Sequence, residues 1–322
     1  MENSTSYLLA ATNNFHASYT KSVNLSFNYK AMDYLYKFKF KVNAKIKPIN
    51  LNSRKTSKPF LSSDTYYALC NFAINSNSDL DNLINQCRHY DLVYIQGHLI
   101  EKLKKQIDKI IPNSLNKLII MESDTLQVAQ ELKPLLTLTK SIYSNNLIGK
   151  VDCIFPLPLG LERQCYKSAG VLKDFRKPYI NKVEKRPITF LVAWNDATNL
   201  NRSIYRDMFK KSDKSLIINS RISPKVVHNL MRKTLFVPSP AGNGLDCHRT
   251  WEALYLGAIP VVLEKEYCGD KNWPVLVINS WQDLLNKNTL ELNKLYKEKS
   301  LKYSEVIDFS NHILRKLVAN NG

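Results

Sequence analysis

The sequence predicts an α/β fold in two domains, and three observations support this prediction. The chain has 322 residues, whereas a single hydrophobic core stops growing at roughly 250–300 residues, so two domains of about 150 residues each are expected. Hydrophobic residues make up 44% of the chain, which is the usual share for a chain that folds throughout. Short apolar runs alternate with helical patterns, as is typical of parallel sheets covered by helices on both faces.

One isolated strand signal precedes this alternating pattern. Residues 34–42 alternate apolar side chains with lysines, and a period of two indicates a half-buried strand. From Ser62 onward the Ser-Ser-Asp sequence favours a helix start, because these side chains accept hydrogen bonds from the free N–H groups of a first turn. That helix is expected to continue as far as Phe72.

The remaining elements follow from apolar runs and their breakers. In the first domain we expect strands at 91–95, 117–121, 141–143 and 152–155, with helices at 99–110 and 125–133. In the second domain we expect strands at 188–193, 215–219, 234–237 and 259–263, with helices at 199–210, 223–232, 247–256 and 291–318. Residues 166–186 are basic and lack an apolar period, so they are interpreted as a linker. The predicted boundaries are 1–165, the linker 166–186, 187–290, and 291–322 as a helix that packs across both domains.

The net charge of +18 has two interpretations. The lysines are dispersed, which favours solvated helix surfaces, but they also suit an anionic partner such as a nucleotide diphosphate or a membrane surface. Neither an RNA-binding motif nor zinc-finger spacing occurs, so nucleic-acid binding is not expected. The six cysteines form no CxxC pair and are expected to be reduced thiols. The one Asp-x-Asp, Asp79 to Asp81, is interpreted as a helix cap, so no metal site is predicted.

No targeting signal is evident in the sequence. The amino terminus has no basic region before its short apolar run, so a signal peptide is not expected. No stretch approaches the roughly 18 apolar residues of a membrane span. The sequence therefore predicts a cytoplasmic protein, with peripheral membrane association through its lysines left open.

The segment 236–263 carries the clearest signal of a ligand site. It predicts a strand, a glycine-containing loop, a helix and a further strand, and ligands of open α/β sheets bind at such loops. Gly242 and Gly244 allow close approach of a ligand, while the helix start offers free N–H groups to a phosphate. Arg249 and Glu252 follow on one helix face, where the carboxylate suits ribose hydroxyls. Alternatively, these two residues pair with each other and the glycines only form a turn.

The string GNGLDCHRTWEALYLGAIPVV, residues 242–262, resembles the carboxyl-terminal motif of the exostosin-like glycosyltransferases. The shared features are a proline- and glycine-containing loop, an Arg shortly before Glu-Ala-Leu, and Gly-x-Ile-Pro-Val. Looser similarities occur upstream at residues 63–66, 122–124, 144–146, 158–161 and 198–202. The chain departs from the family where it has Met-Glu-Ser-Asp at 121–124, because the usual sequence there is His-Asn-Ser-Asp.

This resemblance implies a GT-B architecture, with two Rossmann-like domains facing across a cleft. It implies transfer of a sugar from a nucleotide diphosphate donor, UDP-linked, to a hydroxyl of a glycan or glycoconjugate, with inversion and without a metal or other cofactor. Arg202 is expected either to neutralise the leaving diphosphate or to be a surface residue. The donor-binding residues that the resemblance implies are Arg202, Ser239, Gly242, Asn243, Gly244, Asp246, His248, Arg249 and Glu252.

An inverting transfer needs a general base from the first domain. Asp124 and Glu122 follow the predicted strand 117–121, and His98 follows the strand 91–95. Asp124 is the predicted base, although it also suits a helix cap, and His98 also suits an ordinary loop. A different class of function stays open: a non-catalytic basic module with a degenerate donor fold that binds anionic glycans or a membrane surface.

Overall fold

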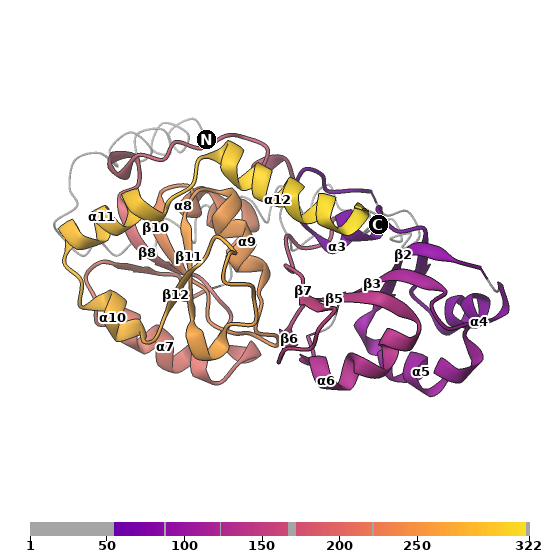
Figure 1. Ribbon diagram of the computed structural model, residues 1–322. Coiled ribbons are helices and arrows are strands. Elements are labelled where there is room, and N and C mark those ends of the chain that lie inside the picture. The colour runs from indigo at the N-terminus through magenta and orange to yellow at the C-terminus, as the bar shows by residue number, and fades with distance from the viewer. Residues whose placement is uncertain (1–54, 87, 123, 167–171, 221, 320–322) are drawn as a thin grey trace, which may run out of the picture.

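The protein is an α/β fold with two five-stranded parallel sheets (Figure 1). The structure is a computed structural model that describes residues 55–319 except 87, 123, 167–171 and 221. The strand expected at 34–42 lies outside the described residues. Within the described part of the chain, no helix has the length and apolar character needed to cross a membrane.

The first sheet has the strand order β1-β2-β3-β5-β7. Its strands are β1 Phe72–Ile74, β2 Tyr90–Gln96, β3 Leu115–Met121, β5 Thr139–Ser144 and β7 Ile154–Pro156. Its helices are α3 Ser63–Tyr67, α4 Asn77–Gln86, α5 Ile100–Lys105 and α6 Ala129–Leu132. The strands predicted from apolar runs are confirmed, because β2 and β3 are buried along most of their length.

Two predictions in this half are wrong, and the helix expected at 99–110 is shorter than predicted, because α5 ends at Lys105 and Ile107–Lys109 form a separate 3-10 turn. The helix that Ser62 caps ends at Tyr67 and does not reach residue 72, because residues 72–74 form the edge strand β1. The helix expected at 125–133 is only the single turn α6. Before it, Gln127–Val128 form strand β4, which pairs with β6 at Leu147–Ile148. Because Gln127 and Val128 are in a strand, the helix cannot begin before them.

The second sheet has the strand order β12-β11-β10-β8-β9. Its strands are β8 Ile188–Val192, β9 Ser215–Ile217, β10 Thr234–Pro238, β11 Ile259–Leu263 and β12 Leu276–Ile278. Its helices are α7 Asn201–Lys210, α8 Pro224–Met231, α9 His248–Tyr255 and α10 Trp281–Leu285. Pro224 opens α8 as predicted, since a proline in the first helical turn has no N–H that would need an acceptor.

The single helix expected at 291–318 is two helices, α11 Thr289–Lys299 and α12 Tyr303–Val318. Ser300 and Lys302 between them have extended backbone, and Glu305 of α12 accepts a hydrogen bond from the backbone N–H of Lys302. A new helix start therefore interrupts the apolar pattern, which continues across the break.

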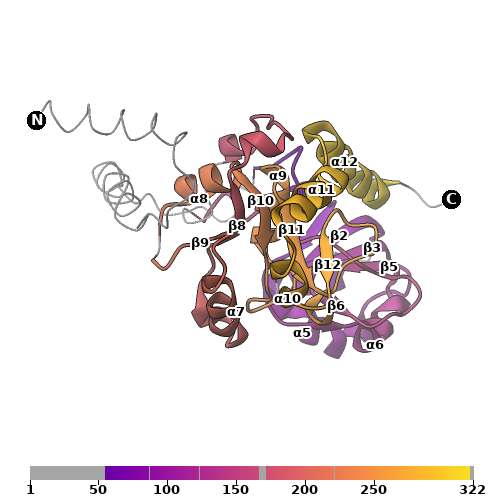
Figure 2. The same ribbon diagram turned by 90° about the vertical axis from the view of Figure 1, so that its left-hand side faces the viewer.

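Helix α12 joins the two halves of the molecule (Figures 1 and 2). Both views place α12 on one side of the first sheet and α5 and α6 on the other. One hydrophobic core contains Ile119 of β3, Val237 of β10, Trp251 of α9 and Leu314 of α12. Lys117 of β3 is buried and donates to backbone carbonyl groups at the end of α12. The two halves therefore share one hydrophobic core, to which α9 and α12 contribute.

Candidate functional site

A cleft of about 1250 Å³ lies where the carboxyl ends of strands from both sheets meet. In parallel sheets the loops at these ends are the usual place for ligands. We call the lining residues between Ser63 and Tyr166 the first wall. We call Thr198, Arg202 and the loop 242–248 the second wall. The cleft therefore lies between the two halves, with each half supplying one wall.

The loop 242–248 follows β10 and bonds to both halves. Asn243 donates from Nδ2 to Oδ2 of Asp124 at 3.1 Å, and the backbone N–H of Asp246 donates to Oδ1 of Asn146 at 2.8 Å. The carboxylate of Asp246 accepts from the backbone N–H of Leu159 at 2.8 Å and from Nε1 of Trp251 at 2.9 Å. Burial raises the pKa of Asp246 to about 6, although these hydrogen bonds act in the opposite direction.

Both predicted glycines of this loop lie where a side chain has no room. A Cβ on Gly244 would lie 2.4 Å from Nδ2 of Asn146, and one on Gly242 would lie 2.8 Å from Nη2 of Arg202. Contacts below 3.0 Å force a neighbouring group to move. The glycines therefore let the loop lie directly against Asn146 on one side and Arg202 on the other.

Arg202 is buried, so its interpretation as a surface residue is wrong. Its guanidinium N–H groups donate to backbone or uncharged side-chain acceptors only. These acceptors are the carbonyl oxygens of Asn195, Pro240 and Ala241, Oγ1 of Thr198 and Sγ of Cys247. Burial lowers the pKa of Arg202. Arg202 thus holds the start of the loop and brings a positive charge to the second wall, where it forms no ion pair with a carboxylate among the described residues.

His248 also lies on the second wall and contacts the first half. Its Nδ1 donates to the carbonyl oxygen of Gly160 at 2.8 Å, which leaves Nε2 3.4 Å from Oε2 of Glu162. The hydrogen bond fixes which ring nitrogen carries the proton. His248 therefore has a defined orientation at the start of α9.

Three residues predicted to bind a donor are not among the residues that line this cleft. Ser239 is buried and donates from Oγ to the carbonyl oxygen of Val237. Arg249 and Glu252 are half-buried. The alternative in which they pair with each other is wrong, because no ion pair or hydrogen bond joins them within the described chain. Nη1 of Arg249 is buried without an acceptor among the described residues.

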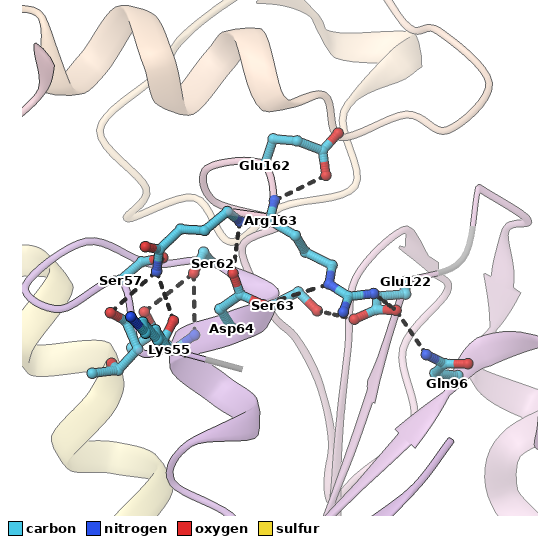
Figure 3. A network of polar contacts seen from close by, with 12 residues as sticks. Lys55, Ser57, Ser62, Ser63, Asp64, Gln96, Glu122, Glu162 and Arg163 are labelled. Atoms are coloured by element: carbon cyan, nitrogen blue, oxygen red, sulfur yellow. Dashed lines mark hydrogen bonds and ion pairs between the residues drawn. The ribbon is translucent and has the colours of Figure 1, made fainter. Parts of the chain in front are cut away.

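On the first wall, Glu122 is the centre of a polar network (Figure 3). Its carboxylate accepts hydrogen bonds from Oγ of Ser63, the hydroxyl of Tyr94, Nε2 of Gln96 and Nη1 of Arg163, at 2.5 to 3.0 Å. Its backbone has φ of 60°, a left-handed conformation that costs a non-glycine residue about 1–2 kcal/mol. Four hydrogen bonds hold Glu122 in this conformation at the end of β3.

The network extends through Arg163 to Asp64, neither of which the sequence analysis identified as a site residue. Both side chains are buried. Nε of Arg163 lies 3.5 Å from Oδ1 of Asp64, whose Oδ2 accepts from the backbone N–H of Gln164 at 2.8 Å. Figure 3 shows Arg163 reaching from its own segment toward Glu122. The sequence pointed to these two residues only indirectly. Asp64 lies in the stretch 63–66, and Arg163 closely follows 158–161, and both stretches resemble the exostosin-like glycosyltransferases.

The remaining candidates, Asp124 and His98, are exposed and line the first wall. The interpretation of Asp124 as a helix cap is wrong, because α6 begins at Ala129 and its N-cap is Val128. Asp124 instead accepts from Asn243 across the cleft. His98 lies in a short turn of 3-10 helix after β2, and its ring makes no hydrogen bond within the described chain.

Metal and thiol chemistry receive no support from the described residues. No group of three His, Cys, Asp or Glu side chains there is arranged to hold a metal ion. Asp79 accepts from the backbone N–H of Asn75 and from Oγ of Ser76 at the start of α4, as a capping residue does. The five described cysteines are free thiols, and burial raises the pKa of Cys247 beside the cleft.

Comparisons with known proteins do not assign the chain to a family. No protein-family model matches it, and a search of curated proteins finds no match.

Proposed function

We propose that this protein is a glycosyltransferase of GT-B architecture that transfers a sugar from a nucleotide diphosphate donor to a hydroxyl acceptor. One observation carries the proposal: a glycine-containing loop and a helix start form one wall of an interdomain cleft whose other wall carries carboxylates. The cleft volume of about 1250 Å³ exceeds the roughly 300–1,000 Å³ of pockets for one small ligand. Two substrates that react with each other need such a volume.

The second wall has the chemistry that a diphosphate requires. Helix α9 begins at His248, and its N-cap residue Cys247 supplies no side-chain hydrogen bond to the first turn. The first N–H groups and the positive end of the helix dipole therefore face the loop without a side-chain cap. Arg202 adds a positive charge that forms no ion pair with a carboxylate among the described residues. Arg249 lies just beyond this wall, in the first turn of α9, and its buried Nη1 has no acceptor in the described part of the chain. These groups would stabilise negative charge on the departing diphosphate.

In the reaction that we propose, an acceptor oxygen attacks the anomeric carbon of the donor sugar. The bond between that carbon and the phosphate oxygen breaks, and the nucleoside diphosphate leaves with the electron pair. Asp124 takes the proton of the acceptor hydroxyl. Its position supports this role, because it lies on the first wall and contacts Asn243 of the second, so it would lie between an acceptor on one wall and a donor on the other.

Glu122 is a weaker candidate for the base. Its carboxylate already accepts four hydrogen bonds from the protein, one of them from a guanidinium group, so it is held in place by internal partners. Glu122 acts in this proposal as a positioning residue that holds Arg163. His98 is the second candidate, since its ring is exposed in the cleft.

The experiment that tests the proposal is a thermal-shift screen of the purified chain against nucleoside diphosphates and nucleotide sugars. A ligand at 100 times its Kd stabilises the native state by about 2.7 kcal/mol, which raises the melting temperature measurably. We expect a shift for one base, and its loss in Arg249→Ala. Arg315→Ala, which removes an exposed arginine of α12, is the matched control and should retain the shift. The absence of a shift with every nucleotide would overturn the proposal.

A further inference from the structure

The cleft carries much less positive charge than the rest of the molecule. The chain contains 46 Lys and Arg residues, yet no lysine occurs among the described residues that line the cleft. Its two arginines, Arg163 and Arg202, are already hydrogen-bonded within the protein. Four carboxylates line the first wall, namely Asp79, Glu122, Asp124 and Glu162. The described residues of this wall therefore lack the excess of positive charge that a bound polyanion requires.

Arg163 does not change this balance. One guanidinium group lies between two carboxylates, with Nη1 3.0 Å from Glu122 and Nε 3.5 Å from Asp64, so the three side chains together are negative. The side chain of Arg163 is 6% exposed. Nε has no hydrogen-bond acceptor among the described residues, and Nη2 makes no hydrogen bond there. Arg163 is thus a fixed N–H donor whose charge is compensated, which suits a hydroxyl or carbonyl oxygen better than an anion.

The same wall presents aromatic rings beside its polar groups. Tyr67, Phe72 and Tyr166 line it. Tyr166 is 48% exposed, and its ring centre lies 5.7 Å from Cζ of Arg163. A sugar ring has an apolar face of C–H groups and an edge of hydroxyls, so it matches an aromatic face with carboxylate and guanidinium groups at its border.

We infer that the first wall is the acceptor subsite and that it takes an uncharged carbohydrate. Hydroxyl groups of the acceptor donate to carboxylates such as Asp79 and Glu162, and its apolar face packs against Tyr166. A sulfated or uronate-containing chain would place its anions against these carboxylates and is excluded. The inference rests on the proposed function, which assigns the opposite wall to the donor.

The test is a glycan array in which neutral oligosaccharides are each paired with a sulfated derivative of the same backbone. The full chain is applied at about 0.3 M NaCl, so that the exposed lysines are screened. We expect binding to neutral members, with their sulfated partners bound at least tenfold more weakly. Tyr166→Ala should weaken the neutral signal about tenfold or more. Leu290→Ala, which removes an exposed apolar side chain of α11 outside the cleft, should leave it unchanged.

Two results would overturn the inference: a preference for sulfated members that Tyr166→Ala abolishes, or binding to no neutral member. The nucleotide thermal-shift experiment on the same preparation separates this failure from that of the proposed function. A nucleotide shift without neutral-glycan binding refutes only the acceptor class. If neutral glycans bind in a way that depends on Tyr166 but no nucleotide shifts the melting temperature, the carbohydrate site is supported. The proposed transferase activity is then refuted.

Discussion

Asn146 and Asp246 join the two halves of the molecule, because the backbone N–H of Asp246 donates to Oδ1 of Asn146 at 2.8 Å. Gly244 packs on the same Asn146 side chain. The loop that we assign to the donor is therefore part of the contact between the halves. Any movement of this loop on ligand binding would be transmitted to the first half through Asn146.

Gly244→Ala is expected to destabilise the protein by about 1–3 kcal/mol, because its methyl group would overlap the Asn146 amide. Asn146→Gly removes that amide, and glycine tolerates the φ of 52° at this position. In the Asn146→Gly background, Gly244→Ala should therefore cost less. Urea denaturation of the four proteins measures this coupling. An equal cost of Gly244→Ala in both backgrounds would contradict the contact.

Gly160 and Gly149 form a matched pair for a second test. Both have a left-handed backbone, with φ of 74° and 80°. A Cβ on Gly160 would lie 2.2 Å from the backbone oxygen of Leu61, whereas the nearest atom at Gly149 is Cβ of Ala129 at 3.8 Å. Gly149→Ala should cost only the backbone strain, about 1–2 kcal/mol.

Gly160→Ala should cost at least about 2 kcal/mol more than Gly149→Ala, because a backbone atom cannot rotate away as a side chain can. The measurement is the free energy of unfolding of both variants. Similar values for the two would show that the segment around Leu61 does not lie against Gly160 in solution.

The buried carboxylate of Asp246 predicts a pH dependence of stability. Burial raises its pKa to about 6, above the value of about 3.9 that an unfolded chain has. The folded state then binds more protons than the unfolded state between these values, so the contribution of Asp246 is complete below about pH 4 and is lost as the pH rises to about 6. Asp246→Asn removes this titration.

The free energy of unfolding of the wild type, minus that of Asp246→Asn, should therefore fall between about pH 4 and 6 and stay constant above about pH 7. Urea denaturation at several pH values measures this difference, in which the other carboxylates cancel. A difference that is constant over the whole range would show that the pKa of Asp246 is not raised in the folded protein.

The sequence predicted most strands of the two sheets because buried parallel strands are continuous apolar runs. It missed β1 and β12, which are edge strands of three residues each. They are apolar, but a run this short does not distinguish a strand from other structure. It also missed the break between α11 and α12, because the apolar pattern continues across residues 300–302. Local capping interactions decided the helix boundary there.

The two walls of the candidate site differ in how far they could be predicted. The loop 242–248 is contiguous, so its glycines and the following helix start were visible in one stretch of sequence. The network around Glu122 connects segments 41 and 59 residues away, through Arg163 and Ser63, and the Gln164 contact of Asp64 spans 100 residues. No periodicity links such positions, so only the folded chain reveals that they meet.

Substitutions of the two exposed candidates should identify the base. Asp124→Asn keeps an oxygen that can accept from Asn243 but cannot take a proton, so it should lower kcat by about 10²–10⁴ while leaving the nucleotide thermal shift intact. His98→Gln should change kcat little. Transfer rates with the donor from the thermal-shift screen provide the measurement. A large loss in His98→Gln with near-normal Asp124→Asn would move the role to His98.

Lys117 should hold the end of α12 on the first half. Its Nζ donates to the carbonyl oxygens of Lys316 and Leu317 at 3.1 and 3.0 Å and also to that of Ala319. Lys117→Met keeps the apolar stem but leaves these acceptors without their donor, at an expected cost of about 1–3 kcal/mol.

Amides of the last turn of α12 should then exchange with deuterium faster in Lys117→Met, while those of β10 in the second sheet keep their protection. Lys109→Met, which removes an exposed lysine, is the control and should leave both regions unchanged. Hydrogen-exchange mass spectrometry resolves the two regions. Unchanged protection at residues 314–319 would mean that packing of Leu314 and Leu317 alone holds α12 on the first sheet, since both side chains are buried in the shared core.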